Sequence, residues 1–246
     1  MGRRREQNED ALLVDPEPCL FVVADGMGGH AGGGTASSIA VETIQKSVRA
    51  AREAVPAAFA AVPPQDAGHF PTVLRGAVEA ASREIYRAAL EDPSLAGMGT
   101  TVTSVLMVGR TAFMAHVGDS RCYLLRAGRI FQISEDHSLV NEQLKAGAIT
   151  EEEARSSRFR NIITRSVGFE EGVRVDVVGL EIEQGDVLVL CSDGLSNLVT
   201  DAEILEIADG SPLTEAPEKL VALANERGGD DNITVIVVKV DGAREA

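Results

Sequence analysis

The chain has 246 residues, of which 44% are hydrophobic and 25% are charged, a balance typical of a globular protein rather than a disordered one. Its 38 acidic and 23 basic residues leave a formal net charge of -15. A charge of this sign repels nucleic-acid phosphates, so we expect no nucleic-acid partner. No apolar run approaches the length that crosses a bilayer and the N-terminus is polar, so we expect no membrane partner and a cytoplasmic location.

The first half of the chain contains strand and helix patterns in turn. An apolar run predicts a strand at 20–24, and apolar residues at helical spacing predict helices over 35–48 and 73–85. Alternating patterns with short turns then predict an antiparallel meander of four strands, at 101–107, 111–117, 121–125 and 130–133.

The second half begins with a polar stretch that we interpret as a mobile excursion from the sheet, with a flap at about 136–170. Two capping patterns, Thr150-x-x-Glu153 and Thr200-x-x-Glu203, predict helix starts. Further patterns predict strands at 174–180, 187–191 and 233–240 and helices at 200–210 and 214–227. Neither a repeat nor a linker divides the chain, so we expect one α+β domain over 1–246, an antiparallel sheet sandwich flanked by helices.

Four aspartates share one kind of position, the polar end of an apolar strand: Asp25, Asp119, Asp193 and Asp231. Each alone is an ordinary turn residue, but four carboxylates at adjacent strand ends raise one another's pKa unless a cation neutralises them. A ligand set of oxygens without cysteine or histidine suits magnesium, manganese or calcium rather than zinc. Glycine follows Asp25 and Asp193, which predicts a tight turn and a carbonyl close to the bound ion.

Two other routes to chemistry are weaker. The chain has three widely spaced cysteines, Cys19, Cys122 and Cys191, and we expect them to be buried reduced thiols. None of them begins the C-x5-R loop of a cysteine phosphatase. Residues 26–31 fit the relaxed dinucleotide pattern G-x-G-x-x-A, which leaves a nicotinamide-dependent oxidoreductase as a remote alternative. Against it, a second helix follows the first, and Asp25 would lie beside the pyrophosphate.

Six motifs in succession resemble those of the metal-dependent type 2C protein phosphatases (PPM family) in their bacterial form. The motifs are REQNED at 5–10, ADGMGGH at 24–30, GMGTT at 97–101, HVGDSR at 116–121, CSDGL at 191–195 and GDDNIT at 229–234. The resemblance implies a β-sandwich between pairs of α-helices that hydrolyses phosphoserine and phosphothreonine in proteins. It also implies direct attack by a hydroxide that bridges two Mn²⁺ or Mg²⁺ ions, with no other cofactor.

The resemblance also assigns the metal ligands. In this assignment Asp25 bridges the two core ions. The carbonyl of Gly26 completes the coordination shell of one ion, and Asp193 and Asp231 hold the other ion. Asp119, together with Asp193, matches a third and weaker metal site under the flap.

The remaining implied roles belong to residues around the metals. Arg5 matches the arginine that binds the substrate phosphate, so that Arg5, Asp25 and Asp193 are the implied catalytic residues. Glu9 and Asp10 match the acidic pair that orders metal-bound water, with Asn232 beside them. The implied partners are phosphorylated proteins, including serine/threonine kinases and their substrates, and we expect a monomer.

Two departures from the family pattern leave alternatives open, and the function has an alternative as well. Met27 stands where some eukaryotic members have a histidine proposed to protonate the leaving group, so the general acid is His30 or a metal-bound water. Only four residues precede Arg5, so we expect the first family strand to be missing or truncated. A catalytically inactive binding module on the same fold is the main alternative function, although every metal-binding carboxylate is present.

Overall fold

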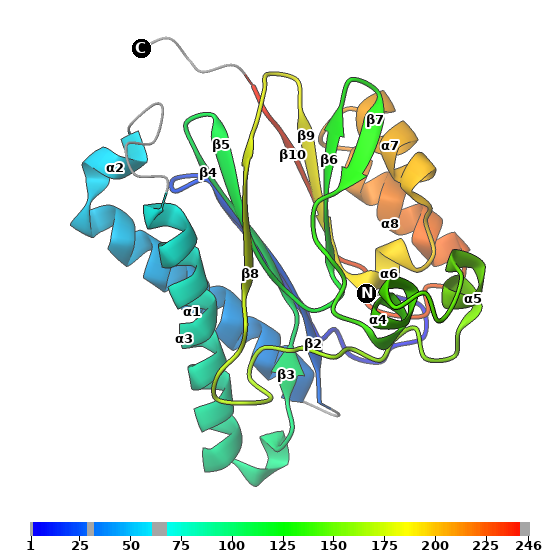
Figure 1. The fold of residues 1–246 in the computed structure, drawn as a ribbon, viewed down its shortest axis with the longest axis horizontal. Coiled ribbons are helices and arrows are strands. Elements are labelled where there is room, and N and C mark those ends of the chain that lie inside the picture. The colour runs from blue at the N-terminus through cyan, green and yellow to red at the C-terminus, as the bar shows by residue number, and fades with distance from the viewer. Residues whose placement is uncertain (1, 29–31, 61–67, 242–246) are drawn as a thin grey trace.

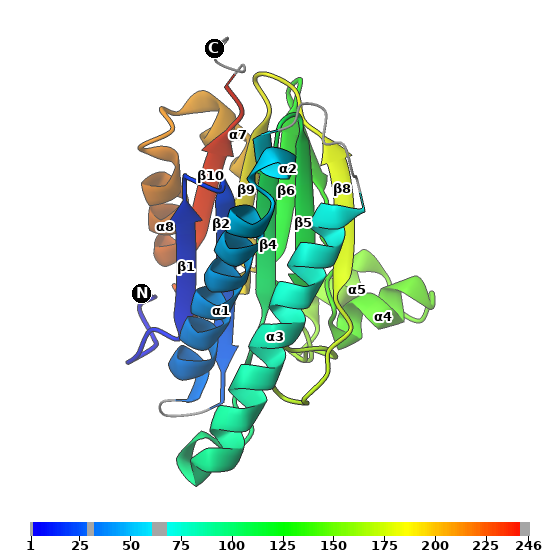
Figure 2. The ribbon, with the colours of Figure 1, turned by 90° about the vertical axis from the view of Figure 1, so that its left-hand side faces the viewer.

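Two antiparallel sheets stack face to face between helices in the computed structural model, which describes residues 2–28, 32–60 and 68–241 (Figure 1). The first sheet has the order β1-β2-β4-β5-β8, with β3 paired to β2, and the second has the order β10-β9-β6-β7. Helices α1 and α3 cross the outer face of the first sheet (Figure 2). Helices α7 and α8 cover the second sheet, which confirms the predicted sandwich flanked by helices.

The strands are β1 (Asp10–Asp15), β2 (Leu20–Met27), β3 (Gly99–Thr100), β4 (Val102–Val108), β5 (Thr111–Val117), β6 (Arg121–Arg126), β7 (Arg129–Gln132), β8 (Asp176–Glu181), β9 (Val187–Cys191) and β10 (Val235–Lys239). The helices are α1 (Gly32–Ala54), α2 (Pro56–Ala60), α3 (His69–Glu91), α4 (Leu139–Lys145), α5 (Glu151–Ser156), α6 (Asp193–Ser196), α7 (Asp201–Gly210) and α8 (Ala216–Glu226), with a 3-10 turn at Pro93–Leu95.

Three apolar layers hold these elements together. Strand β2 contributes to two of them: Leu20 and Val22 pack against α1 and α3, whereas Phe21 and Val23 pack between the sheets. Successive side chains of a strand point to opposite faces, so a strand buried on both faces is apolar throughout. The third layer lies between the second sheet and α7 and α8. This double burial explains why the run at 20–24 lacks alternation.

The predicted four-stranded meander is wrong. Strands β4 and β5 form a hairpin in the first sheet and β6 and β7 form one in the second. Both sides of β5 are occupied, by β4 and β8, so β6 pairs with β9 instead. The link at 118–120 therefore crosses between the sheets, and three residues can span the spacing of about 10 Å between stacked sheets.

Strand β1 was not predicted from the sequence. It pairs with β2 at the edge of the first sheet, where the side chains of Leu12 and Val14 are 52% and 53% exposed. Its four central residues are all apolar, so the sequence lacks the alternation of an edge strand.

Within the described ranges no strand precedes Arg5, and β10 pairs with β9 alone. The missing first family strand remains a prediction.

Both predicted capping patterns are present. The side chains of Thr150 and Glu153 bond each other's backbone N–H groups at the start of α5, and Thr200 and Glu203 do the same for α7. Helix α7 ends at Gly210, as predicted.

The cysteines correct one expectation. Cys122 and Cys191 are buried thiols, as predicted, whereas Cys19 is exposed in the link between β1 and β2. Of the helices described, none combines the length and apolar character needed to cross a bilayer.

Candidate functional site

Five aspartates from five strand ends converge at one end of the sandwich, the lower end in Figure 1. Asp10 begins β1, Asp25 lies near the end of β2, Asp119 follows β5, Asp193 follows β9 and Asp231 precedes β10. The pKa of Asp25 is raised well above its usual value, first by burial and then by the charges of the other four. The structure thus brings together the four aspartates singled out in the sequence and adds Asp10 to them.

The other carboxyls of the cluster respond in the same way. Burial and the neighbouring charge of Asp193 raise the pKa of Asp119 to about 8. Burial and the charge of Asp231 raise the pKa of Asp193 to about 6. Like charges at close range favour the protonated form, whereas a cation among them favours the ionised form. The cluster is therefore an electrostatic setting for a positive ion.

Asp10 joins the two sheets at this end. Its Oδ2 accepts hydrogen bonds from the hydroxyls of Thr234 (2.6 Å) and Ser192 (2.9 Å), which flank β10 and β9. Its Oδ1 is buried without a hydrogen-bond partner in the structure. Neither hydroxyl was assigned a role from the sequence, although both lie inside the motifs at 191–195 and 229–234.

Two threonines hold the backbone of Asp25. Thr101 Oγ1 accepts the Asp25 N–H (3.0 Å), and the Asp25 carbonyl accepts hydrogen bonds from Thr101 N–H (2.8 Å) and Thr100 Oγ1 (2.9 Å). The sequence did not reveal this support. The only signal was the motif at 97–101, in which no threonine was given a function.

The glycines after Asp25 and Asp193 have a different purpose from the one predicted. Strand β2 continues through Gly26 to Met27, so no turn follows Asp25. The chain does turn after β9, where the N–H of Leu195 donates to the Ser192 carbonyl (3.1 Å), but neither glycine has a positive φ. A Cβ at Gly26 would lie 2.0 Å from the carbonyl oxygen of Gly33, and one at Gly194 would lie 1.9 Å from that of Asn232. Close backbone packing, not turn conformation, requires these glycines.

Arg5 and Asp231 form an ion pair at the edge of the cluster. Arg5 Nη2 donates to Asp231 Oδ2 over 2.7 Å, and the arginine side chain is 49% exposed. Asn232 secures the same segment, because its Oδ1 accepts the Glu9 N–H (2.8 Å) and its Nδ2 donates to the carbonyl of Gln7 (3.1 Å). The residues predicted near the N-terminus therefore do lie beside the cluster.

The donor atoms at this site fit hard divalent cations. Three buried carboxylate oxygens have no hydrogen-bond partner among the residues that the structure describes: Glu9 Oε1, Asp10 Oδ1 and Asp193 Oδ1. Such atoms are costly to bury unless a ligand satisfies them. In the described ranges no group of three or more acidic, cysteine or histidine side chains is arranged to hold a metal ion. Magnesium usually keeps several water ligands and takes only one or two carboxylates from the protein.

The histidines do not identify a general acid. His30 lies outside the described residues. His116 is buried between the Thr103 hydroxyl (3.0 Å) and the Glu135 carbonyl (3.0 Å), and burial lowers its pKa to about 4. His116 is therefore a neutral core residue.

Comparisons with known proteins agree with this geometry. The profile of protein phosphatase 2C matches residues 2–233. The chain is 38% identical to the serine/threonine phosphatase stp of Listeria monocytogenes over 245 residues, which cover 98% of this chain and 93% of that protein. It is 36% identical to the protein phosphatase PhpP of Streptococcus pneumoniae over 253 residues, covering 98% and 95% of the two chains.

Solved structures show the same fold. The serine/threonine phosphatase PstP/Ppp of Mycobacterium tuberculosis superposes with a TM-score of 0.86 at 35% identity, covering 98% of this chain and 95% of that one. The catalytic domain of serine/threonine protein phosphatase PstP, solved in complex with two manganese ions, superposes with a TM-score of 0.84 at 34% identity. That match covers 98% of this chain and 94% of the other.

Proposed function

Because the chain belongs to the protein phosphatase 2C family, we propose that it is a metal-dependent phosphatase acting on phosphoserine and phosphothreonine in proteins. The observation that carries this proposal is the cluster around Asp25, where burial and four neighbouring carboxyls raise the pKa of the Asp25 side chain. Relatives that match almost the whole chain are named serine/threonine phosphatases, which supports the same activity.

The cluster would hold two Mn²⁺ or Mg²⁺ ions. We assign Asp25, the carbonyl of Gly26, Asp193 and Asp231 to these ions, and Asp119 with Asp193 to a third and weaker one. The free carboxylate oxygen of Asp193 supports the assignment. When bound, the ions supply Lewis acidity, which lowers the pKa of water and offsets charge on the phosphate oxygens.

The chain's own residues bind and orient the reactants. The guanidinium of Arg5 can bind two phosphate oxygens at once and offset the charge on the leaving oxygen, which a lysine cannot do with the same geometry. Its bond to Asp231 already holds it at the edge of the cluster. The unpartnered oxygens of Glu9 and Asp10 are acceptors for ordered water, and Asn197 Nδ2 orients Asp193 Oδ2 (3.0 Å).

The alternatives make different predictions. A dinucleotide-binding unit needs a parallel strand after its first helix, whereas β3 pairs antiparallel with β2 in this fold. The structure therefore contradicts the oxidoreductase alternative. An inactive binding module would bind phosphopeptides without hydrolysing them, and the intact set of carboxylates argues against it.

The partners and the location of the protein are further proposals. Relatives named phosphatases act on phosphorylated proteins, and we propose that the substrates here include serine/threonine kinases and their targets. We propose further that the chain acts as a cytoplasmic monomer. Size-exclusion chromatography with light scattering tests the monomer, and dephosphorylation of a kinase from the same cell tests the partner.

Hydrolysis of p-nitrophenyl phosphate and of a phosphothreonine peptide with Mn²⁺, with Mg²⁺ and with EDTA tests the activity. We expect turnover only with a metal, and a loss of at least about 100-fold in kcat for Asp25→Ala or Asp193→Ala, since each variant loses an assigned metal ligand. The control is Asp209→Ala, an exposed aspartate on α7, which should behave as wild type. Full turnover by metal-stripped protein in EDTA would contradict the two-metal proposal.

A further inference from the structure

Gly118, which directly precedes Asp119, has both backbone polar groups bonded to one residue, His137. The N–H of His137 donates to the Gly118 carbonyl over 2.7 Å, and the Gly118 N–H donates to the ring Nδ1 of His137 over 3.0 Å. Gly118 has a φ of 112°, and a Cβ there would lie 2.6 Å from the Thr101 side chain. The backbone that leads into Asp119 is therefore fixed by His137, a residue outside the link at 118–120.

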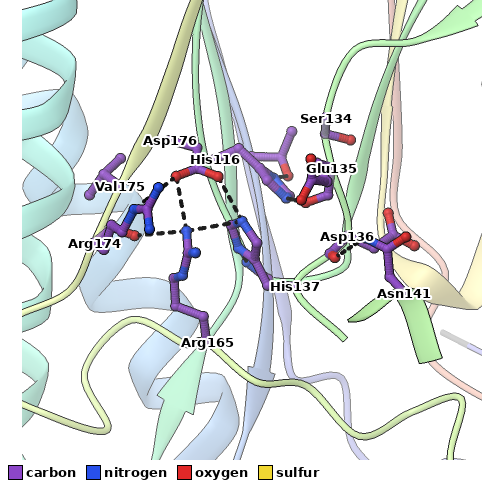
Figure 3. Close-up of polar contacts among 12 residues, drawn as sticks. His116, Ser134, Glu135, Asp136, His137, Asn141, Arg165, Arg174, Val175 and Asp176 are labelled. Carbon is purple, nitrogen blue, oxygen red and sulfur yellow. Dashed lines mark hydrogen bonds and ion pairs between the residues drawn. The ribbon is translucent and has the colours of Figure 1, made fainter. Parts of the chain in front are cut away.

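The opposite side of the His137 ring is also bonded (Figure 3). Because Nδ1 accepts a hydrogen bond, the neutral ring carries its proton on Nε2 and donates it to Asp176 Oδ2, 2.9 Å away. Arg165 Nη1 donates to Asp176 Oδ1 (3.0 Å) and to the Arg174 carbonyl (3.3 Å). Arg165 Nη1 also lies 3.0 Å from His137 Nε2. Both of these atoms are donors, so this contact is not a hydrogen bond. Asp176 thus fixes both the tautomer and the plane of the ring.

His137 lies where the two ends of the flap meet. The N–H of Thr164 donates to the His137 carbonyl (2.9 Å), and Ser138 forms an isolated β-bridge with Ile163. His137 is only 5% exposed and burial lowers its pKa, which favours the neutral ring that these hydrogen bonds need. The base of the flap is thereby bonded to the link that carries Asp119.

We propose that His137 is a positioning residue for Asp119: it fixes the Gly118 backbone from the flap, and Asp176 and Arg165 hold its ring in place. Asp119 then keeps the orientation that the weaker third cation needs. This inference rests on the proposed function and adds to it a physical connection between the flap and the weak metal site.

Two isosteric substitutions separate the two hydrogen bonds of the ring. In His137→Asn the amide oxygen can take the place of Nδ1 and accept the Gly118 N–H, whereas in His137→Gln the amide nitrogen can take the place of Nε2 and donate to Asp176. We expect His137→Gln to weaken the third Mn²⁺ site by about 10- to 100-fold, the usual effect of losing an outer hydrogen bond. Its kcat should fall with KM little changed. His137→Asn should stay closer to wild type, because it keeps the acceptor for Gly118 and loses only the contact that holds the ring.

A second measurement does not depend on metal or turnover. Amide hydrogen exchange of the metal-free protein should be fast at Gly118 in His137→Gln and slow in both wild type and His137→Asn. The control is Asp186→Asn, because Asp186 is a buried carboxylate bonded to Arg126 (2.6 Å) at the opposite end of β9. This variant should lower the melting temperature and leave the third site unchanged.

Calorimetric titration with Mn²⁺ separates the possible outcomes. Equal behaviour of the Asn and Gln variants, a parallel loss at all three metal sites, or a third-site loss in Asp186→Asn would each overturn the proposal. A wild-type protein that binds only two ions would overturn the role given to Asp119. A wild-type protein without phosphatase activity would instead contradict the proposed function, while exchange at Gly118 would still report the His137 contact.

Discussion

The carboxyl of Asp25 shows how single residues set the pH behaviour of this protein. Burial and neighbouring charge raise the pKa of Asp25, bring that of Asp193 to about 6 and bring that of Asp119 to about 8. An unfolded aspartate titrates near pKa 3.9. Between the unfolded pKa and the raised pKa of each aspartate, the folded protein binds more protons than the unfolded chain. The free energy of unfolding therefore falls as pH rises through this range.

We therefore predict that the metal-free protein, kept in EDTA, loses thermal stability from about pH 4 up to the pKa near 8 of Asp119. Saturating Mn²⁺ should remove most of this slope, because the cation favours the ionised carboxylates. Melting temperatures measured across pH with and without Mn²⁺ test this, and Asp119→Asn should flatten the metal-free curve. A melting temperature that rises with pH in EDTA would show that the carboxyls do not repel one another.

Arg5 allows a second prediction at this scale. Arg5→Ala should raise KM and lower kcat/KM by about 10- to 100-fold with metal binding retained, because a charge-assisted bidentate contact to phosphate is lost. Arg5→Lys should recover little of the loss. The control is Arg4→Ala, since Arg4 is an exposed neighbour paired with Asp230 (3.0 Å). Unchanged kinetics of Arg5→Ala would class Arg5 as a surface charge.

At the scale of elements, the start of α1 and the end of β2 pack backbone to backbone. The N–H of Gly26 donates to the Glu9 carbonyl (3.1 Å), and a Cβ at Gly26 would lie 2.6 Å from that same oxygen and 2.0 Å from the Gly33 oxygen. Any side chain at Gly26 would push the two elements apart, and with them the carboxylate of Asp25.

We therefore predict that Gly26→Ala lowers the melting temperature and weakens Mn²⁺ binding, because overpacking costs about 1–3 kcal/mol or more. The matched control is Gly76→Ala in the middle of α3, where a Cβ meets nothing within 4 Å. There the same substitution should stabilise by about 0.5–1 kcal/mol. Urea denaturation of both variants measures the difference, and equal effects would refute the packing argument.

For the whole molecule, the contacts of Asp10 hold the two sheets together beside the site. The hydrogen bond from Thr234 Oγ1 to Asp10 Oδ2 joins residues 224 positions apart in the chain. We predict that Thr234→Val destabilises the fold by about 1–3 kcal/mol, because a buried carboxylate loses one of its donors. The variant should also weaken Mn²⁺ binding. Chemical denaturation and calorimetry test both effects.

A matched change at a distant polar contact serves as the control for Thr234→Val. Thr72→Val removes an exposed hydroxyl that donates to the carbonyl of Gly68, the residue before α3 (2.9 Å). The Thr72→Val variant should change stability little and leave metal binding intact. If Thr234→Val proves as mild as this control, the contact between the sheets through Asp10 is not important for the site.

Local patterns in the sequence were enough to locate most elements and the aspartates proposed as metal ligands. Strands β5 and β9 begin and end at the residues that alternation or apolar runs predicted, and the capping residues Thr150 and Thr200 mark the starts of their helices. Hydrophobic period, turn chemistry and capping act over a few residues, so a sequence reports them directly. The aspartates at strand ends were visible for the same reason, as were the motifs that identify the family.

Tertiary structure alone decided how these parts meet. Local patterns do not state which strand pairs with which, and the occupied edges of β5 placed β6 in the other sheet. The hydroxyls around Asp10, the pairing of Arg5 with Asp231 and the hold of His137 on Gly118 all join segments distant in sequence. Such contacts depend on the packing of two sheets against each other, and the free energy that selects this packing is a property of the whole core.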